Sequence, residues 1–249
     1  MPSFWQRLRR GLRAHFVLLA ALLAGLVLPW VVFINVAEDI WESGGFIGDR
    51  QILDFLHQHA TPLFDKVALG FTAVGGPLPM SIMAGLVAAG LAVWGSRSVA
   101  WFFVLSVGGA MGLNLLVKLL FARPRPALWV SLKPAFYYSF PSGHAMGAAA
   151  VVTALGFLAW RQRGPWRRLV WALGPLFALG VGWSRVYLGV HYPSDVLAGW
   201  TGAVGWVVAV HVLFSPAFHQ LRRQWRGALH QQLPTLVAAP ADAPAAPPA

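Results

Sequence analysis

Cysteine is absent from the 249-residue chain, and charged residues make up only 11% of it. The lack of cysteine excludes disulfide bonds, catalysis by a thiolate and zinc sites with cysteine ligands. A soluble domain of this length carries about 25% charged residues, whereas 57% of this chain is hydrophobic. The shortage of charge therefore predicts an integral membrane protein.

Acidic residues are also scarce, with 8 Asp and Glu against 19 Lys and Arg. A net charge of +11 is typical of proteins that bind nucleic acid, but here the cations form short clusters between apolar runs. In such positions cations set membrane topology and meet anionic lipids. We therefore expect membrane lipids as partners and no nucleic acid.

Long apolar runs are abundant. A helix needs about 20 apolar residues to cross the hydrocarbon core, and six runs approach that length: Phe16–Val36, Val67–Trp94, Val99–Leu120, Ser142–Trp160, Leu169–Leu188 and Ser194–Phe214. The predicted fold class is all-α, a polytopic membrane bundle of six transmembrane helices within residues 16–214. The first run is longer than a signal-peptide core, which favours a retained helix over a cleaved signal.

The segments between and beyond these runs have their own character. The stretch from Glu38 to Asp65 is acidic, and we expect a solvated external surface there. Within it, Asp49–Ala60 has helical spacing of apolar residues, which predicts a short interfacial helix between the first and second transmembrane helices. Residues 1–15 form a basic cytoplasmic N-terminus, 215–233 a basic interfacial segment, and 234–249 a disordered Ala- and Pro-rich tail.

The distribution of cations predicts the topology. With the N-terminus in the cytoplasm, twelve of the 19 Lys and Arg fall inside, and so does the C-terminus. Among the cations left outside, Lys118, Arg123, Arg125 and Arg185 lie at the ends of predicted helices. Such residues often reach toward the interface simply to stay hydrated. Because the positive-inside rule disfavours this side, the cluster instead suggests a bound anion.

Three short motifs share this outer face. They are KLLFARPRP from Lys118 to Pro126, PSGH from Pro141 to His144, and SRVYLGVHYPSD from Ser184 to Asp195. Cations such as these stabilise the charge that a phosphoryl group spreads over its oxygens in transfer. The Pro-Ser-Gly segment opens a helix, whose free backbone amides and positive dipole end favour the same anion. The motifs therefore predict phosphoryl transfer.

Two histidines supply the chemistry in this interpretation. Asp195 follows His191 by four residues, so its carboxylate reaches one ring nitrogen and fixes the tautomer. The other nitrogen attacks phosphorus and forms a phosphohistidine. His144 protonates the leaving oxygen as general acid. A purely structural His191–Asp195 hydrogen bond is the alternative for that pair taken alone. Asn114, one turn before Lys118, is expected to make a structural hydrogen bond.

The order and spacing of the motifs resemble those of the type 2 phosphatidic-acid phosphatase family, the lipid phosphate phosphatases. This family shares its site motifs with the vanadium haloperoxidases and the bacterial acid phosphatases. The match has no departure at the signature positions between Lys118 and Asp195. With the six-helix plan, the resemblance extends over roughly Asp49–Phe214. It implies catalytic roles for His191, His144 and Asp195, and phosphate binding by Lys118, Arg125, Ser142, Gly143 and Arg185. Arg123 and Ser184 are second-rank candidates beside these motifs.

The expected function is metal-independent removal of phosphate from a lipid phosphate or pyrophosphate. The substrate class includes phosphatidic acid, phosphatidylglycerol phosphate and undecaprenyl pyrophosphate, without a cofactor. A phosphotransferase that passes the phosphoryl group to a lipid or sugar acceptor is the alternative, and a non-catalytic membrane scaffold is a third reading. We expect a bacterial inner membrane with the site facing the periplasm. The sequence does not specify an oligomeric state.

Overall fold

The computed structural model describes residues 20, 23–133, 136–160 and 164–215. The predictions for residues 1–15 and 234–249, and for 215–233 apart from Ser215, lie outside these ranges. The chain divides into two compact units, residues 1–211 and 212–249. The helices and the site described below belong to the first unit, apart from the end of the last helix.

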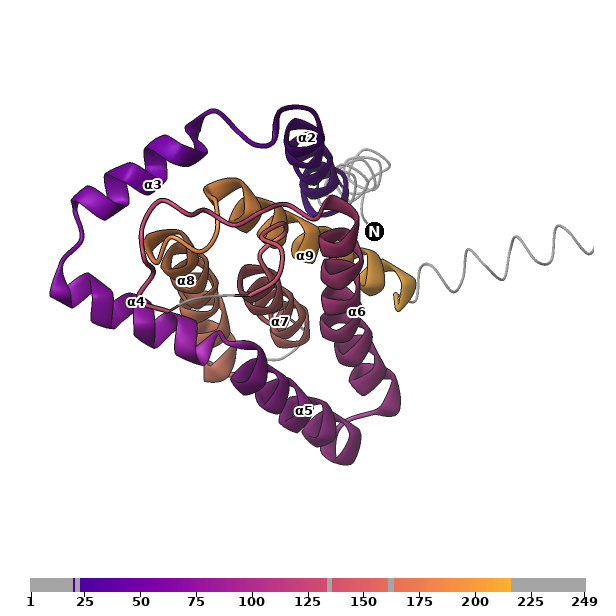
Figure 1. Cartoon of the computed structure of the whole chain (residues 1–249). Coiled ribbons are helices and arrows are strands. Elements are labelled where there is room, and N and C mark those ends of the chain that lie inside the picture. The colour runs from indigo at the N-terminus through magenta and orange to yellow at the C-terminus, as the bar shows by residue number, and fades with distance from the viewer. Residues whose placement is uncertain (1–19, 21–22, 134–135, 161–163, 216–249) are drawn as a thin grey trace, which may run out of the picture. The chain divides into compact units, whose positions relative to one another are not determined.

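Every regular element in the described ranges is a helix (Figure 1). A π-helical turn at Leu23–Val27 leads into the first α-helix. The helices are α2 (Leu28–Ser43), α3 (Gly48–Gln58), α4 (Pro62–Val74), α5 (Pro77–Trp94), α6 (Arg97–Phe121), α7 (Gly143–Trp160), α8 (Pro165–Tyr187) and α9 (Pro193–Leu213).

Within the described ranges, six helical stretches are long and apolar enough to cross a membrane. They are Leu23–Ser43, Pro77–Trp94, Arg97–Phe121, Gly143–Trp160, Pro165–Tyr187 and Pro193–Leu213. The prediction of an all-α bundle with six transmembrane helices is confirmed, and the protein is a multi-pass membrane protein.

The first transmembrane helix continues further than the sequence pattern predicts. The apolar run ends at Val36, whereas α2 continues to Ser43. No Gly or Pro interrupts residues 36–43, so the backbone keeps its hydrogen bonds although the acidic side chains there are exposed. Gly44 ends the helix in the left-handed conformation, with φ of 77°, and its amide donates to the Ile40 carbonyl. This conformation is open to glycine without steric cost.

The second predicted run, Val67–Trp94, is divided between two helices. Gly75, Gly76 and Pro77 separate α4 from α5, because proline takes the first position of a new helix and cannot continue an old one. A Cβ on Gly75 would lie 2.6 Å from the Val181 side chain, so glycine is required where α4 meets α8. The short helix predicted for Asp49–Ala60 corresponds to α3, whereas the second membrane-spanning helix begins at Pro77 instead of Val67, with the separate helix α4 before it.

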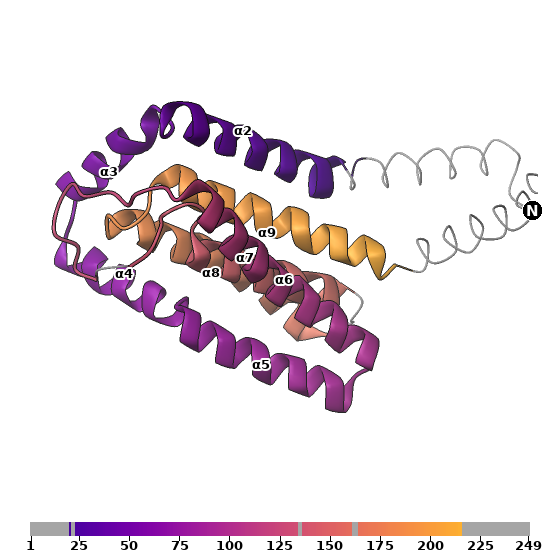
Figure 2. The same cartoon turned by 45° about the vertical axis from the view of Figure 1, so that its right-hand side comes forward.

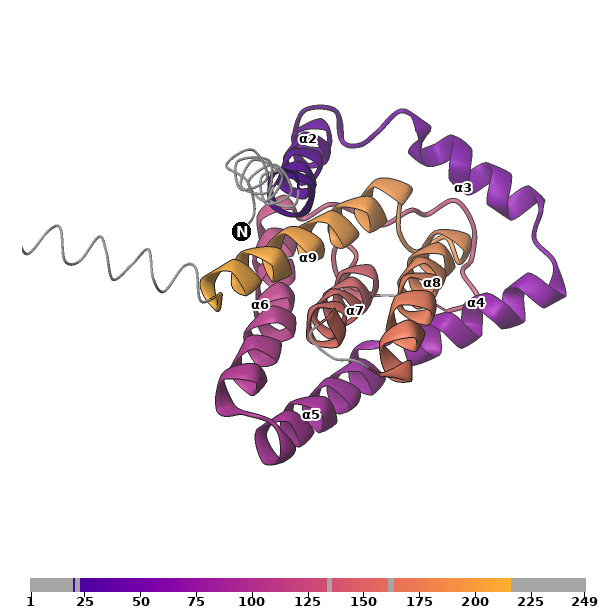
Figure 3. The ribbon, with the colours of Figure 1, turned by 180° about the vertical axis from the view of Figure 1, so that it is seen from behind.

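Helix α7 lies at the centre of the bundle, enclosed by α5, α6, α8 and α9 in opposite views (Figures 1 and 3). Its sequence, GHAMGAAAVVTALGFLAW, is dominated by small residues, and ten of its eighteen residues are buried. Small side chains let neighbouring helices approach closely in a membrane, where packing holds helices together. In contrast, the peripheral helix α5 buries only Met80.

Candidate active site

The three motifs meet at one end of the bundle. Lys118 lies in the last turn of α6 and Arg185 in the last turn of α8. His144 lies in the first turn of α7, and Asp195 in the first turn of α9. Successive long helices alternate in direction, so these four turns lie together, beside α3, α4 and the loop after α6 (Figure 2). His191 lies in the turn that joins α8 to α9.

A cavity of about 1090 Å³ opens among these turns. Its lining includes six of the predicted site residues: Lys118, Arg125, Gly143, His144, Arg185 and His191. Within the described ranges, no three His, Cys, Asp or Glu side chains form a group that could hold a metal ion. The three cations and two histidines are instead suited to hold an anion.

His191 is held between a carboxylate and a guanidinium. Its Nδ1 lies 3.3 Å from Oδ2 of Asp195, which also accepts from the Tyr192 amide at 2.9 Å. On the other side, Nη1 of Arg125 lies 3.0 Å from Nε2. A guanidinium can only donate, so Nε2 is the acceptor and the ring proton belongs on Nδ1, as this network assigns it.

The protonation of His191 follows from its surroundings. Its side chain is almost fully buried, at 1% exposed. Burial, and after it the positive charges of Arg125, Arg185 and Lys118, hold the pKa of His191 well below its usual range. Both effects disfavour the imidazolium form. A neutral ring at pH 7 keeps a lone pair on Nε2, which is the requirement for a nucleophile.

The backbone of the turn sets the position of this ring. The amides of Val190 and His191 both donate to the Arg185 carbonyl, each at 3.2 Å. Gly189 has a φ of 67°, and a Cβ at this residue would lie 2.6 Å from the Trp129 ring. Only glycine meets both conditions without strain. Pro193 takes the first position of α9 and so ends the turn.

Two of the cations are anchored by backbone carbonyls. The Nζ of Lys118 donates to the carbonyls of Tyr138, at 2.8 Å, and Pro141, at 3.1 Å. The guanidinium of Arg125 donates to the carbonyls of Phe136, Tyr137, Tyr138 and Val190. The loop between α6 and α7 therefore fixes both charges beside His191 before any substrate arrives.

Two buried polar atoms at the site have no hydrogen-bond partner in the described part of the chain. They are Nε of Arg185 and Oγ of Ser142. Another nitrogen of Arg185, Nη1, donates to Oγ1 of Thr72 on α4. A buried polar group left unsatisfied costs about 1–3 kcal/mol, so such groups call for an explanation. A phosphate oxygen would accept from both donors.

The PSGH segment is packed tightly against α6 and α9. The Ser142 amide donates to the Asp195 carbonyl at 3.0 Å, so the expectation of a free amide is wrong for this residue. The amides of Gly143 and His144 belong to the first turn of α7, which leaves them without helical partners. A Cβ on Gly143 would lie 3.2 Å from Oδ1 of Asn114. Asn114 itself donates to the Pro141 carbonyl at 3.1 Å, the structural hydrogen bond that was expected.

The two second-rank candidates, Ser184 and Arg123, make different kinds of contact. The Ser184 hydroxyl donates to the Val181 carbonyl of its own helix at 2.7 Å. Arg123 is 5% exposed and forms ion pairs with Asp195 at 2.6 Å and with Asp49 at 2.9 Å. Its guanidinium therefore lies behind the Asp195 carboxylate, on the side away from His191.

The sequence pattern gave no indication of two residues at the site. Asp49 was expected on a solvated surface, but it is only 3% exposed and bonds to Arg123 and Ser194. The local sequence does not separate it from Asp54, an exposed residue of the same helix. Thr72 lies on α4, far from the motifs in sequence, and reaches Arg185 only through helix packing.

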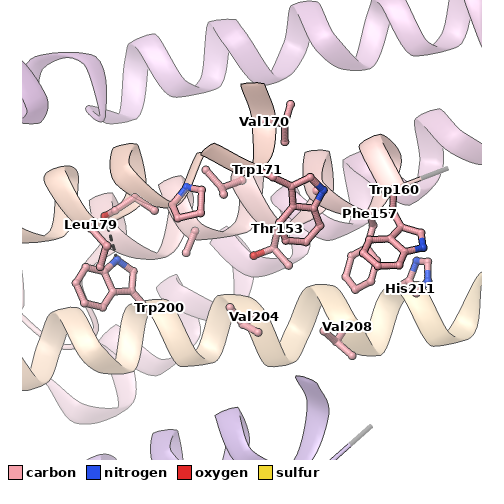
Figure 4. A pocket seen from close by; sticks show the side chains of 15 residues that line it. Thr153, Phe157, Trp160, Val170, Trp171, Leu179, Trp200, Val204, Val208 and His211 are labelled. Atoms are coloured by element: carbon pink, nitrogen blue, oxygen red, sulfur yellow. Dashed lines mark hydrogen bonds between the residues drawn. The ribbon is translucent and has the colours of Figure 1, made fainter. Parts of the chain in front are cut away.

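A second cavity, of about 730 Å³, lies among α7, α8 and α9 (Figure 4). Aromatic side chains line much of it, with Trp200 toward one end and Trp160 and His211 toward the other (Figure 4). The His211 ring stacks on Phe157 with centroids 4.0 Å apart. None of the residues of the three motifs lines this second cavity.

The chain is similar to known proteins in sequence and in fold. A sequence model of the PAP2 superfamily matches residues 99–219. Phosphatidylglycerophosphatase B of Bacillus subtilis (strain 168) is 31% identical over 146 residues, which cover 56% of this chain and 70% of that protein. The undecaprenyl-diphosphatase of Sulfolobus acidocaldarius is 37% identical over 112 residues, 42% of this chain and 50% of that protein.

Two further matches extend the comparison. Human glucose-6-phosphatase 3 is 39% identical over 215 residues, 76% of this chain and 53% of that protein. The chain thus spans about half the length of this relative and of the undecaprenyl-diphosphatase. The crystal structure of a transmembrane PAP2 type phosphatidylglycerolphosphate phosphatase from Bacillus subtilis superposes with a TM-score of 0.66 at 27% identity, covering 74% of this chain and 93% of that one.

The helical fold and the relatives together define a multi-pass membrane phosphatase. The chain belongs to the PAP2 superfamily. The family resemblance expected from the three motifs is thereby confirmed, and so is the expectation of an enzyme of the phosphatase class.

Proposed function

We propose that the chain hydrolyses a lipid phosphate or pyrophosphate through a phosphohistidine on His191. The observation that carries this proposal is the setting of His191. Its Nε2 lies on a cavity lined by Lys118, Arg125 and Arg185, while Asp195 holds Nδ1 from behind. A neutral nucleophile in front of fixed cations is the arrangement that attack on phosphorus requires.

The reaction follows in two steps. In the first, the lone pair of Nε2 forms a bond to phosphorus and the bond from phosphorus to the lipid oxygen breaks. His144, which lines the same cavity, gives its proton to that oxygen. In the second, His144 takes a proton from water, the water oxygen bonds to phosphorus, and the bond to Nε2 breaks. The proton on Nδ1 stays there throughout, and Asp195 stabilises the positive charge of the phosphorylated ring.

The unpartnered donors support binding of the transferred phosphate. Nε of Arg185 and Oγ of Ser142 each gain an acceptor when a phosphate oxygen comes beside them. Arg125 lies within hydrogen-bond distance of Nε2, so it also reaches the oxygens of a group that Nε2 attacks. Gly143 and His144 add amides from the first turn of α7.

The shape of the cavity supports a lipid as substrate. From the cationic end it continues along α5 and α6, past Met80, Ala84 and Val107 to Ala88. The twelve residues from Pro77 to Ala88 correspond to about 18 Å of helix, from a rise of about 1.5 Å per residue. This part of the lining is apolar, and α5 is otherwise exposed on the bundle. A lipid tail in the bilayer could therefore lie here while its phosphate meets His191.

A substrate panel tests this function. The protein is purified in detergent, a chelator is added, and release of phosphate is measured from phosphatidic acid, phosphatidylglycerol phosphate, undecaprenyl pyrophosphate and glucose 6-phosphate. We expect release from at least one of the three lipids, with little from the water-soluble sugar phosphate. Phosphate transferred to an added acceptor instead of water would favour a phosphotransferase, and no reaction on any lipid would favour a scaffold.

The nucleophile is tested by His191→Ala. We expect kcat to fall by at least about 10³-fold, because removing a nucleophile leaves only binding and electrostatic catalysis. The matched control is His59→Ala, an exposed histidine at the end of α3. Full activity in His191→Ala would contradict the phosphohistidine mechanism.

We also propose that the site faces the exterior of a bacterial inner membrane. The distribution of cations supports this orientation, since the opposite end of the bundle carries Arg97 at the start of α6 and Arg167 and Arg168 in the first turn of α8.

A further inference from the structure

Arg123 bridges two buried carboxylates. Its Nη1 donates to Oδ1 of Asp195 at 2.6 Å, and its Nη2 donates to Oδ2 of Asp49 at 2.9 Å. Its Nε donates to the Gly44 carbonyl at 3.2 Å. The guanidinium also lies over the Tyr192 ring, 4.1 Å from the centroid. All three nitrogens of the guanidinium therefore donate to protein acceptors, and one of its faces packs on the Tyr192 ring, which fixes its position.

Asp49 ties this arginine to the start of α9. Its Oδ1 accepts from the Ser194 amide at 2.9 Å, and its Oδ2 accepts from the Ser194 hydroxyl as well as from Arg123. Asp49 lies in the first turn of α3, whereas Ser194 and Asp195 open α9. The carboxylate thus links the interfacial helix to the helix that carries the partner of the nucleophile.

These contacts form a continuous chain of hydrogen bonds and ion pairs from Asp49 to His191. Asp49 holds Arg123, Arg123 holds one oxygen of Asp195, and the other oxygen of Asp195 lies beside Nδ1 of His191. Asp195 is 0% exposed, and Arg123 is the arginine that forms a direct ion pair with it, so loss of Arg123 would leave a buried carboxylate without that pair. A carboxylate in that condition takes up a proton or moves, and either change loses its hold on His191.

The net charge of Asp49, Arg123 and Asp195 also affects the energy of the transition state. Two carboxylates and one guanidinium leave a net charge of −1 behind the imidazole. The ring gains a charge of +1 when Nε2 bonds to phosphorus while Nδ1 keeps its proton. Asp49 supplies the carboxylate that is left over after Arg123 and Asp195 neutralise each other. Loss of this carboxylate therefore removes negative charge that favours the transition state over the ground state.

We propose that Asp49 and Arg123 are positioning residues for the nucleophile, acting through Asp195, and that the first turn of α3 is thereby coupled to His191. The proposal rests on the proposed function, because it needs His191 to be the group that attacks phosphorus. Neither residue lines the cavity, so neither is expected to touch the substrate.

Four variants test it: Asp49→Asn, Arg123→Gln, Arg123→Lys, and Asp54→Asn as an exposed control on the same helix. With the best lipid substrate of the wild type, we expect kcat to fall about 10-fold in Asp49→Asn and about 100-fold in Arg123→Gln, the range for removing a group that orients a reacting side chain. KM should change less than about threefold. Lysine should restore part of the loss, since it keeps the charge but cannot grip both carboxylates.

A double variant separates positioning from a purely structural role. If Asp49 acts through Arg123, Asp49→Asn should cost little more in the Arg123→Gln background, so the two losses should not multiply. Inhibition by inorganic phosphate should stay near the wild-type value, because Lys118, Arg125 and Arg185 are untouched.

The outcomes that overturn the proposal are distinct from those that overturn the function. Wild-type kcat in Asp49→Asn and Arg123→Gln, a loss seen only in KM, or losses that multiply would each refute the positioning role. If Arg123→Gln does not fold, Arg123→Lys and Asp49→Asn still decide the question through kcat. A wild type that is inactive on every lipid refutes the proposed function itself, and the positioning role with it.

Discussion

At the scale of single residues, two neighbours and burial determine the protonation state of His191. Asp195 holds the proton on Nδ1, Arg125 points a donor at Nε2, and burial removes the water that would stabilise a charged ring. Each effect favours the same neutral tautomer. Arg125 has a second function in this arrangement, because it ties His191 to the carbonyls of the loop after α6.

The protonation of His191 gives a first prediction at this scale. Its pKa is lowered by burial and by Arg125, Arg185 and Lys118, and a backbone hydrogen bond with Ser139 opposes them; the His144 ring lies nearby. We expect the ring to stay neutral as the pH falls from 7 through 6.5, the ordinary value for histidine. Isotope-labelled histidine observed by NMR measures this directly, with His191→Gln to assign the resonance.

The same shift has a consequence for stability. Because the pKa of His191 is lower in the folded state than in the unfolded state, only the unfolded state binds the proton between the two values. The contribution of His191 to the free energy of unfolding is therefore fully present above about pH 6.5 and is lost as the pH falls toward its lowered pKa. A His191 resonance that titrates at or above pH 6.5 would contradict both statements.

At the scale of elements, the turn between α8 and α9 sets the distance between the Arg185 guanidinium and His191. Arg185 lies in the last turn of α8 and Pro193 begins α9, with His191, the proposed nucleophile, between them. Two amides of the turn converge on the Arg185 carbonyl, so the cation and His191 are joined by backbone as well as by charge. A small displacement of this turn would separate His191 from the phosphate pocket.

Gly189→Ala is the prediction for this element. A residue with a side chain pays about 1–2 kcal/mol for the left-handed conformation, and the added Cβ would overlap the Trp129 ring. We expect a lower unfolding midpoint in detergent and a fall in kcat of about 10- to 100-fold, since misplacement by about 1 Å can cost 10²-fold.

Gly70→Ala is the matched control on α4. A Cβ there meets nothing within 4 Å, so we expect unchanged kcat. Replacing a glycine inside a helix should also raise stability slightly, by about 0.5–1 kcal/mol. Equal kcat in the two alanine variants would show that the turn tolerates displacement and that this reading of Gly189 is incorrect.

At the scale of the whole molecule, the bundle separates two environments. One end gathers the cations, the histidines and helix α3, and the cavity leads away from this end along α5 and α6. Figure 2 shows α5 and α6 extending away from the end where α3 lies. This arrangement suits a molecule with a charged head and an apolar tail. It also requires the two ends of the bundle to face opposite sides of a membrane.

The absence of cysteine makes the orientation easy to test. Single cysteines are introduced at Asp54 on α3 and at Arg97 at the start of α6, both exposed and at opposite ends of the bundle. In intact bacterial cells we expect a membrane-impermeant maleimide to label Asp54→Cys, and to label Arg97→Cys only after the membrane is permeabilised. The reverse pattern would place the site in the cytoplasm.

The sequence by itself determined the class of fold and the main residues of the site. Hydrophobic run length depends on bilayer thickness alone, so the transmembrane helices could be predicted without tertiary contacts. The motif residues could be found because His191 and Asp195 lie four residues apart and because Lys118 and Arg125 fall on the side of the membrane where the positive-inside rule disfavours cations. Local spacing and topology carry that information.

Only the tertiary structure decided which polar residues outside the motifs belong to the site. Asp49 and Asp54 look alike in sequence, but packing of α3 against α9 buries the first and leaves the second in water. Arg123 looked like a second phosphate ligand beside Arg125, yet its guanidinium turns toward Asp195 and Asp49. The physical reason is that burial and pairing of a charge depend on contacts between segments far apart in the chain, which no local pattern records.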